Sequence, residues 1–388
     1  MARRKSYYKK LKKASPQSII LAIIFLILAV AGYYVYNKYF KEEEPFIEAK
    51  GAISFHFMTL GNGASGDCIY VKAGEYDILI DAGSREDSVD DIQSYVNQYV
   101  KDNKLEFVII THADEDHIAG FAADNSIFDL YKCEIIIDFP LTNKALATEK
   151  GNPTLYAEYI DNRTTEIEND SATYFTALEC YNNKNGAKSV YNLSEDGNVK
   201  MEILYNYYYF NKDDGNDNNH SVCIMFYHGS RKFLFTGDLE KSGEEKFVEF
   251  YEKNNNSVLS QVELFKAGHH GSKTSSNDFL LKYIQPKVCV ICCAAGAHQY
   301  NALPENRFPT QLMVDRIAKY TEKVFVTTLA DPNYVGENEF ADMNGDIVVT
   351  SDEETGVTVK CSNNDTLLKD TAWFINNRTM PDEWKTAA

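Results

Sequence analysis

The chain has 388 residues, of which 44% are hydrophobic, and it carries a formal net charge of −18. That apolar share is ordinary for a globular protein, so the composition excludes a disordered or fibrous chain. Residues 1–17 hold seven basic side chains and no acid, which leaves 32 basic against 57 acidic residues, a net charge of −25, for the rest. So acidic a body disfavours tight binding of nucleic acid, which proteins hold mainly by neutralising phosphates.

An apolar run without any charged side chain, residues 19–36, follows the basic arm directly. Its eighteen residues at about 1.5 Å each reach about 27 Å, close to the roughly 30 Å of a bilayer's hydrocarbon core. The run predicts a single membrane-spanning helix over 18–37, with the arm 1–17 in the cytoplasm and the body outside the cell. A cleaved signal peptide is the alternative, because Ala29–Ala31 reads AVA, and cleavage would secrete the body.

The first half of the body is rich in predicted strands. Residues 38–52 are charged and predict a linker before it. Alternating or apolar runs predict strands at 53–60, 68–74, 76–83, 105–112 and 133–140. Gly74 and Glu75 lie between two of these runs and predict a hairpin, and residues 86–103 have apolar side chains at helical spacing. Residues 141–198 are polar and irregular, and we interpret them as an insertion that could shape a substrate mouth.

The second half repeats this pattern of strands and helices. Strands are predicted at 201–210, 221–229, 232–239, 262–271, 287–296, 323–331, 347–352 and 356–362. Helices are predicted at 240–253, 276–285 and 309–320. Two strand-rich halves with interleaved helices predict an αββα four-layer sandwich, in which two mixed sheets pack face to face with helices outside. We place this domain at residues 53–365 and a C-terminal tail at 366–388.

Eight cysteines lie mostly within apolar runs such as SVCIMF and KVCVICC. Alternation in a strand would bury them as small hydrophobic residues, so they do not suggest a disulfide framework. A metal site at Cys289, Cys292 and Cys293 is the alternative, and the β-branched strand around them favours the core.

The stretch THADEDHIAG, residues 111–120, places four potential metal ligands within six residues, directly after an apolar strand. The four are His112, Asp114, Asp116 and His117. A strand-to-helix turn can aim all four side chains into one cleft, and imidazole and carboxylate are ligands of zinc, manganese and iron. The alternative is a solvated acidic turn in which Asp114 or Asp116 caps a helix.

Four further segments accompany this motif. They are GNGASGDCIYV at 61–71, LIDAG at 79–83, TGD at 236–238 and GHHGSKTSS at 268–276. Together with HADEDH they resemble the metallo-β-lactamase superfamily, whose usual signature is HxHxDH. An aspartate in the third place of the signature resembles the soluble hydrolase domain of the ComEC competence-protein family. The resemblance covers about residues 53–362 and implies a metal-dependent hydrolase.

The resemblance implies two divalent metal ions, zinc or manganese, and assigns their ligands. His112 and Asp114 would hold the first metal. Asp116 and His117 would hold the second, and Asp238 of TGD would bridge the two. Two such ions can share one hydroxide that attacks phosphorus or a carbonyl carbon.

Further roles follow from the remaining motifs. One of His269 and His270 would complete the second metal site, and the other would contact the leaving oxygen or phosphoryl group of the substrate. Asp81 would orient the ligand turn by hydrogen bonds. Gly63 and Gly66 would allow a close backbone approach near the metals. The implied catalytic residues are Asp116, Asp238, His269 and His270.

Two histidines stay open as alternatives. His220 in NNHSV, residues 218–222, stands where the superfamily uses a histidine ligand, and a polar loop residue is the other interpretation. The ComEC family also has a histidine–proline pair near the penultimate strand. Leu303 occupies roughly the place of that histidine here, and His298 upstream is a candidate replacement.

The resulting functional prediction is an exported, membrane-anchored phosphodiesterase or nuclease. Asp114 in place of histidine adds a hard oxygen ligand, which shifts the preference toward manganese, and oxygen-rich dinuclear sites suit phosphoesters. A small anionic or phosphodiester substrate fits, and the acidic body disfavours nucleic acid. The alternatives are hydrolysis of a lactone, thioester or β-lactam at the same metals, and a non-catalytic binding protein. The oligomeric state is left open.

Overall fold

The computed structural model describes residues 47, 51–254, 257–298, 303–336 and 339–385. The basic arm, the predicted membrane-spanning segment and most of the linker lie outside the described residues. Within the described part of the chain, no helix is both long and apolar enough to cross a membrane. The membrane-spanning helix therefore stays a prediction.

The first of two mixed sheets has the strand order β16-β15-β1-β2-β3-β4-β5-β6. Its strands are β1 (Ile53–Phe57), β2 (Ile69–Ala73), β3 (Tyr76–Ile80), β4 (Lys104–Ile109), β5 (Lys132–Asp138), β6 (Thr173–Thr176), β15 (Ile347–Asp352) and β16 (Gly356–Cys361). The pairs from β3 to β6 are parallel and the other pairs are antiparallel. Ala73 pairs with Tyr76, which confirms the hairpin predicted at Gly74 and Glu75.

The second sheet has the order β14-β13-β12-β11-β10-β9-β8-β7. Its strands are β7 (Val190–Asn192), β8 (Val199–Ile203), β9 (Ile224–His228), β10 (Arg231–Phe235), β11 (Leu264–Lys266), β12 (Val288–Ala295), β13 (Val324–Leu329) and β14 (Ala341–Asp342). The pairs from β10 to β13 are parallel, so this sheet mirrors the first in having a parallel part that is edged by antiparallel strands.

Two predicted strands are much shorter than expected. The run 262–271 forms a strand only at Leu264–Lys266, and Gly268–Gly271 form a short 3-10 helix. The run 201–210 leaves the sheet after Ile203 and turns into a short 3-10 helix, Tyr207–Tyr209. The side chain of Asn206 causes the turn, because its amide oxygen accepts the backbone N–H of Tyr208 at 3.0 Å. Its amide nitrogen also donates to the carbonyl of Ser221 at 2.9 Å. This local bonding outweighs the strand preference of the aromatic run.

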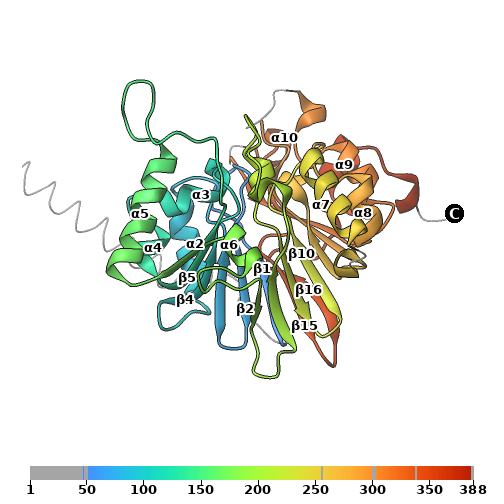
Figure 1. Ribbon diagram of the computed structural model, residues 1–388. Coiled ribbons are helices and arrows are strands. Elements are labelled where there is room, and N and C mark those ends of the chain that lie inside the picture. The colour runs from blue at the N-terminus through green and yellow to red at the C-terminus, as the bar shows by residue number, and fades with distance from the viewer. Residues whose placement is uncertain (1–46, 48–50, 255–256, 299–302, 337–338, 386–388) are drawn as a thin grey trace, which may run out of the picture. The chain divides into compact units, whose positions relative to one another are not determined.

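The two sheets pack face to face through aromatic side chains. The ring of Phe55 on β1 lies 5.4 Å from that of Phe226 on β9 and 4.8 Å from that of Phe233 on β10. Helices cover the outer faces (Figure 1), which confirms the predicted layers. The helices are α2 (Ser88–Val96), α3 (Glu115–Ala122), α4 (Ile127–Leu130), α5 (Leu155–Asn169), α6 (Ala177–Asn182), α7 (Lys241–Lys253), α8 (Asp278–Ile284), α9 (Gln311–Ile317), α10 (Pro332–Val335) and α11 (Ala372–Asn377).

Two further segments bear on the sequence predictions. The residues expected as a C-terminal tail form α11 and bury Trp373 and Trp384 in the core behind the second sheet. The cysteines are all free thiols, and all except Cys361 are buried, as predicted for small core residues.

Candidate metal centre

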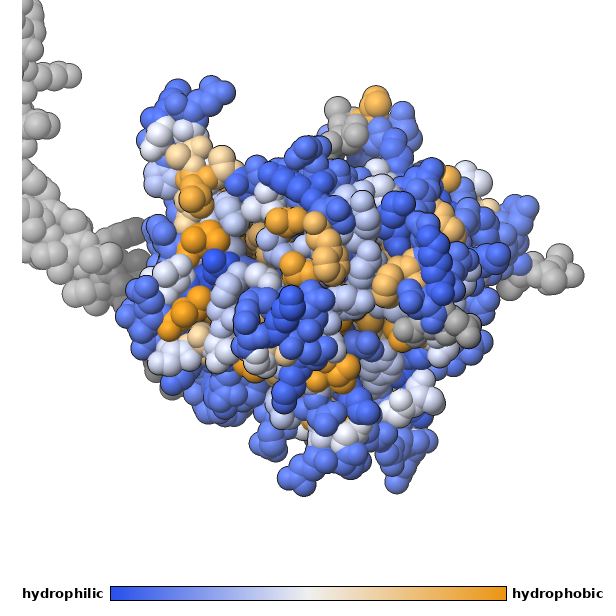
Figure 2. Space-filling model, viewed as in Figure 1, coloured by the Kyte–Doolittle hydropathy of each residue, from blue (hydrophilic) through white to orange (hydrophobic). Residues whose placement is uncertain are grey.

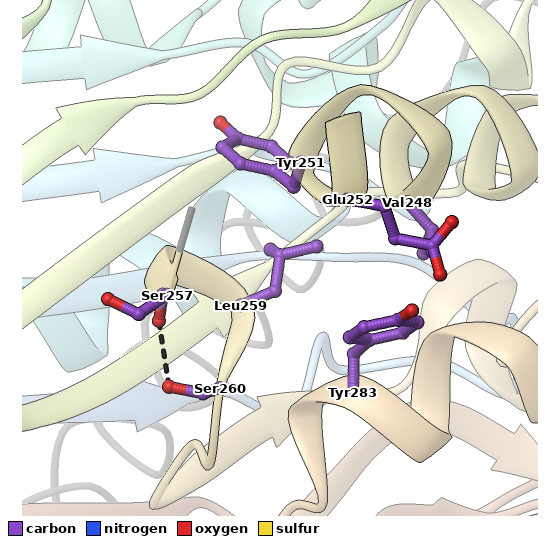
Figure 3. A pocket seen from close by; sticks show the side chains of 7 residues that line it. All are labelled: Val248, Tyr251, Glu252, Ser257, Leu259, Ser260 and Tyr283. Atoms are coloured by element: carbon purple, nitrogen blue, oxygen red, sulfur yellow. Dashed lines mark hydrogen bonds between the residues drawn. The ribbon is translucent and has the colours of Figure 1, made fainter. Parts of the chain in front are cut away.

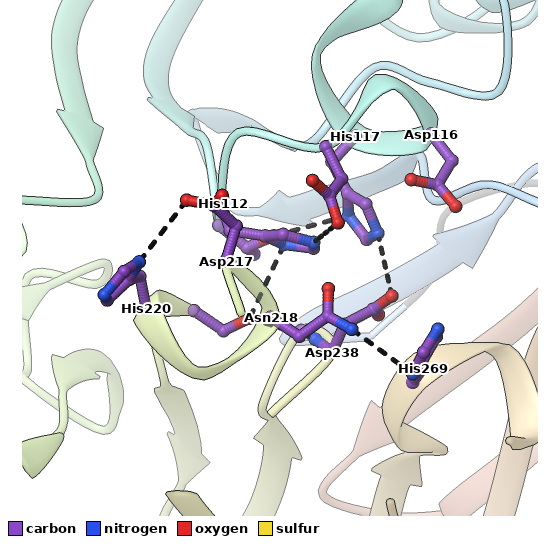
Figure 4. Close-up of polar contacts among 12 residues, drawn as sticks. His112, Asp116, His117, Asp217, Asn218, His220, Asp238 and His269 are labelled. Atoms are coloured by element: carbon purple, nitrogen blue, oxygen red, sulfur yellow. Dashed lines mark hydrogen bonds and ion pairs between the residues drawn. The ribbon is translucent and has the colours of Figure 1, made fainter. Parts of the chain in front are cut away.

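Five of the eight predicted ligands, His112, Asp116, His117, Asp238 and His270, gather where strands from both sheets end (Figure 4). His112 follows β4, Asp238 follows β10, and His270 follows β11. Ligand atoms of His112, His117 and Asp238 lie within 4.8 Å of one another, as do those of Asp116, His117 and His270. His117 belongs to both groups, so they form one cluster. The fold therefore brings together residues as far apart in the sequence as His112 and His270.

The histidine nitrogens at the middle of this cluster lack hydrogen bonds. The Nε2 atoms of His112, His117 and His270 are buried without a hydrogen-bond partner. Nε2 of His117 lies 3.2 Å from Oδ2 of Asp238, and Nε2 of His270 lies 3.3 Å from Oδ2 of both Asp116 and Asp238. Buried polar atoms are nearly always paired, and imidazole with carboxylate is a donor set for divalent cations. The residues present therefore fit the predicted metal ions.

The opposite ring nitrogens are held by acceptors. Nδ1 of His117 donates to Oδ2 of Asp81 at 2.8 Å, and Nδ1 of His270 donates to the carbonyl of Cys292 at 2.9 Å. Both partners only accept, so Nδ1 carries a proton in each ring, and Nε2 is the ring nitrogen that faces the cluster. Asp81 is itself fixed, since it accepts the backbone N–H of Thr111 at 2.7 Å.

The electrostatic environment favours added positive charge. Burial alone would lower the pKa of His117, but the carboxylates of Asp238 and Asp81 raise it well above its usual range. Burial likewise opposes the charge on His270, and the carboxylates of Asp238 and Asp67 raise its pKa well above normal. The cluster therefore stabilises cations at its centre.

Asp114 stands at the N-cap position, directly before α3, but its side chain does not cap the helix. Its backbone is extended, and its carboxylate makes no capping hydrogen bond to the helix. The carboxylate instead lies 3.6 Å from Nε2 of His112 and 2.5 Å from Nζ of Lys144. The acidic-cap interpretation therefore does not describe Asp114, whose side chain faces the cluster.

Glycines let the backbone pack closely behind the ligand turn. A Cβ on Gly66 would lie only 2.6 Å from Cα of Ser84. Gly63 makes its close approach elsewhere, since a Cβ there would lie 3.1 Å from the backbone oxygen of Glu339. The close approach at Gly66 allows the backbone N–H of Asp67 to donate to the carbonyl of Asp116 at 3.0 Å. The glycine-rich turn thus supports the residue that carries a candidate ligand.

The structure separates the roles of the adjacent histidines. Both have left-handed backbones, with φ of 48° at His269 and 52° at His270, and their rings point in different directions. His270 joins the cluster. His269 lies outside the ligand groups, with Nδ1 3.2 Å from Oε1 of Glu240 and 3.1 Å from Oγ1 of Thr274. Figure 4 shows its ring beside Asn218.

His220 is not brought to the cluster (Figure 4). Its Nε2 accepts the backbone N–H of Asp213 at 3.0 Å, and its Nδ1 lies 3.4 Å from Oδ1 of Asp217. Both ring nitrogens are thus engaged by the loop before it. His298 belongs to none of the ligand groups, and its Nδ1 lies 3.4 Å from a guanidinium nitrogen of Arg307.

The structure adds two buried residues that the sequence reasoning missed, Asp67 and Lys266. Their side chains form an ion pair, and Nζ of Lys266 also lies 3.3 Å from Oδ1 of Asp238. Oδ1 of Asp67 lies 3.3 Å from Nδ1 of His270. Each had a signal: Asp67 ends the glycine-rich run, and Lys266 is a lone charge in an apolar strand just before GHHGS.

Two cavities of about 500 Å³ lie at different distances from this chemistry. One adjoins the ligand turn and is lined by Ala113, Glu115, Lys144 and Tyr156 among others. The other lies between α7 and α8 (Figure 3) and is lined by Val248, Tyr251, Glu252, Ser257, Leu259, Ser260 and Tyr283. Neither lining holds an imidazole or a thiol. The first also has the carboxylates of Glu86, Glu115 and Glu158, and Lys144 is its one basic side chain.

Comparison with known proteins matches the segments that build this centre. The sequence model of the metallo-beta-lactamase superfamily matches residues 61–123 and 215–295. Those ranges include the glycine-rich turn, the HADEDH turn, TGD and GHHGS.

Curated relatives point in the same direction. The chain is 30% identical over 114 residues to Recombination protein 2 of Haemophilus influenzae and 34% identical over 117 residues to ComE operon protein 3 of Bacillus subtilis. These matches cover 29% and 30% of this chain but only 13% of each relative. It is also 31% identical over 84 residues to Exodeoxyribonuclease WalJ of Streptococcus pneumoniae, covering 21% of this chain and 30% of that protein. The predicted resemblance is therefore confirmed: the chain is similar to the metallo-beta-lactamase superfamily over the two matched segments and similar in sequence to ComEC-type competence proteins.

Proposed function

We propose that this protein is a metal-dependent hydrolase that cleaves phosphoester bonds at a centre for two divalent ions. One observation carries the proposal: three buried histidine Nε2 atoms, all without hydrogen bonds, converge with the carboxylates of Asp116 and Asp238. A non-catalytic binding protein would have no need of three unpaired imidazole nitrogens in its interior.

The residues divide the work of the reaction. His112 and Asp114 would hold one ion, and the remaining ligands Asp116, His117, Asp238 and His270 would hold or share the other. Bound divalent ions supply an activated water and neutralise the negative charge that develops during hydrolysis. His269 lies outside the ligand cluster with a side chain 23% exposed, so it is placed to give a proton to the leaving oxygen.

Phosphoesters are the favoured substrates for two reasons. Three carboxylates among six ligands make the centre oxygen-rich, which favours hard cations such as manganese that act on phosphoryl oxygens. The similarity to an exodeoxyribonuclease supports phosphodiester chemistry as well. The net charge of −25 outside the basic arm argues for a small anionic substrate over a long nucleic acid.

The full-length chain, stripped with chelator and reloaded with manganese or zinc, tests this function. We expect about two metal ions per chain and hydrolysis of bis-p-nitrophenyl phosphate, with no hydrolysis of nitrocefin. Cleavage of nitrocefin or of lactone substrates instead would support the alternative acyl chemistry. Failure to bind metal after reloading would contradict the enzyme proposal.

Asp238→Ala provides the sharpest variant for the same assay. Asp238 contacts both His117 and His270, so we expect turnover to fall by at least about 1,000-fold while the domain stays folded. Asp90→Ala removes an exposed carboxylate on α2 and serves as the matched control. Wild-type rates in Asp238→Ala would remove the bridging role.

We also propose that the body acts outside the cell, anchored by the N-terminal segment. The support is the basic arm followed by the apolar run 19–36. Protease added to intact cells should digest the body if it is exposed and spare it if it is internal. Detection of the body in the medium would favour the signal-peptide alternative.

A further inference from the structure

A long loop follows β5, and residues at its two ends line the cavity beside the ligand turn. We call residues 141–154 the strap. It is drawn together at its base, where Oγ1 of Thr154 donates to the carbonyl of Ala145 at 2.6 Å, and its tip projects beyond α5 (Figure 1). The surface in this view is largely hydrophilic, including the projecting tip (Figure 2).

The strap is tied to the opposite half of the molecule. Oγ1 of Thr142 and the backbone N–H of Asn143 donate to the same oxygen of Asp217, at 2.6 and 2.8 Å. The side chain of Asn143 donates to the carbonyl of Asp213 at 2.7 Å. These bonds join the end of β5 to the loop before β9, so they fix the backbone at the position next to Lys144.

Lys144 is thereby held over the ligand turn. Its Nζ lies 2.5 Å from Oδ1 of Asp114, and its side chain is 39% exposed and lines the cavity beside the centre.

Neighbouring cations are committed to other partners. Lys266 is buried between Asp67 and Asp238, inside the cluster. Arg85 donates to the carbonyl of Ser84 at 2.7 Å and lies 3.4 Å from a carboxylate oxygen of Glu115. Among the residues that the structure describes, Lys144 is the cation that both lines this cavity and pairs with a metal-ligand candidate.

The ion pair between Lys144 and Asp114 should weaken when Asp114 binds a metal ion. A carboxylate that binds a divalent ion has less negative charge left to attract an ammonium. The flexible four-carbon stem of lysine can then carry its charge to an anion in the adjoining cavity, while the strap backbone stays in place.

We propose that Lys144 is a specificity-determining residue whose ammonium binds the anionic group of the substrate beside Asp114. This inference rests on the proposed function and names a substrate contact for it. The strap positions Lys144, so this contact belongs to the insertion and not to the common ligand motifs. The lysine ammonium is a compact charge with three N–H donors, so it can bind a phosphate oxygen in several orientations.

Binding of inorganic phosphate to the manganese-loaded full-length chain tests the proposal by calorimetry. Lys144→Met should weaken phosphate binding by about 10-fold or more, the usual effect of losing a charge-assisted hydrogen bond. Lys144→Arg should retain most of the affinity. Equal affinities in the wild type and Lys144→Met would overturn the proposal.

A matched control separates contact from general charge. Lys150→Met removes the same charge from the exposed tip of the same strap, away from Asp114. We expect phosphate affinity to stay within about 2-fold of wild type in this variant. An equal loss in Lys150→Met and Lys144→Met would reduce the effect to long-range charge and contradict the proposed contact.

Metal titration gives a readout that does not depend on turnover. Lys144→Met removes a cation that competes for Asp114, so its first-metal affinity should rise by up to about 5-fold. Phosphate binding through Lys144 without hydrolysis of any phosphoester would contradict the proposed function and leave this inference standing. Hydrolysis with unchanged KM and unchanged phosphate affinity in Lys144→Met would contradict this inference and leave the proposed function standing.

Discussion

The two halves of the metal centre are built differently. In the inner half, His117 and His270 each donate Nδ1 to a fixed buried acceptor, and Asp238 is held by Lys266 through its other oxygen. In the outer half, Asp114 has a side chain 28% exposed and is held by a lysine on a surface loop. The fold itself therefore orients the inner ligands, whereas the outer half depends on the strap.

This difference has a consequence for metal loading. Ligands already held in their binding orientation lose less conformational freedom when they bind an ion, so the inner half should bind more tightly. We expect the first equivalent of metal to occupy the inner half and the second to complete the outer half. Variants of the two halves should therefore differ in the number of metal ions that they bind, even when both variants remain folded.

The largest effect is expected for His270→Ala. Removing an inner ligand should lower the affinity for the first metal ion by more than about 100-fold and abolish turnover. Losing a side chain that only supports a ligand usually lowers metal affinity by about 10- to 100-fold, and losing the ligand itself should lower it further. His269→Ala is the matched control, since its ring lies outside the cluster. It should bind two metals and lose only rate. Equal metal loss in both variants would contradict the assignment of His270 as the ligand.

Lys266→Met probes the internal cation of the inner half. The change leaves Asp67 and Asp238 without their buried partner, which should cost about 3–5 kcal/mol of unfolding free energy in chelator. Added metal should recover part of that loss, since it supplies replacement positive charge. Denaturant unfolding with and without zinc measures both quantities. Wild-type stability in chelator would show that the pair contributes little.

Asp81→Asn should have a smaller effect on the same half. The amide can still accept a hydrogen bond from His117, but it no longer supplies the negative charge that favours the proton on Nδ1. We expect metal affinity to fall by about 10- to 100-fold, as for other partners of metal-binding histidines. Measurement by competition with a chromogenic chelator would show it, and an unchanged affinity would leave Asp81 with a purely structural role.

The sequence predicted the parts of this molecule that are encoded by contiguous patterns. Alternating apolar runs located most strands, because burial on one sheet face imposes that period. HADEDH, TGD and GHHGS located the ligands, because a turn after a strand places neighbouring residues together. The strand at 201–210 ended early because one side chain, Asn206, bonds its local backbone, and such single contacts leave no periodic signal.

Other features of the site depend on contacts between distant segments. The choice between His269 and His270 rests on two left-handed residues and the carbonyl of Cys292, which composition does not reveal. Lys266 looked like an isolated charge in an apolar strand, because its partner Asp67 lies about 200 positions earlier. Lys144 met Asp114 only through the strap's bonds to Asp217.

His220→Ala carries the smallest expected effect and tests the outer half most directly. The ring of His220 is engaged by the backbone of Asp213 and by Asp217, so its removal should leave two metals per chain and change turnover by less than about 3-fold. Asp217 also holds the strap, so a modest rise in KM is the expected sign of a loosened Lys144. Loss of the second metal would instead return His220 to the ligand role that the family resemblance implies. The loop 213–220 would then have to rearrange on metal binding, and the outer half would be assembled by the ion instead of by the strap.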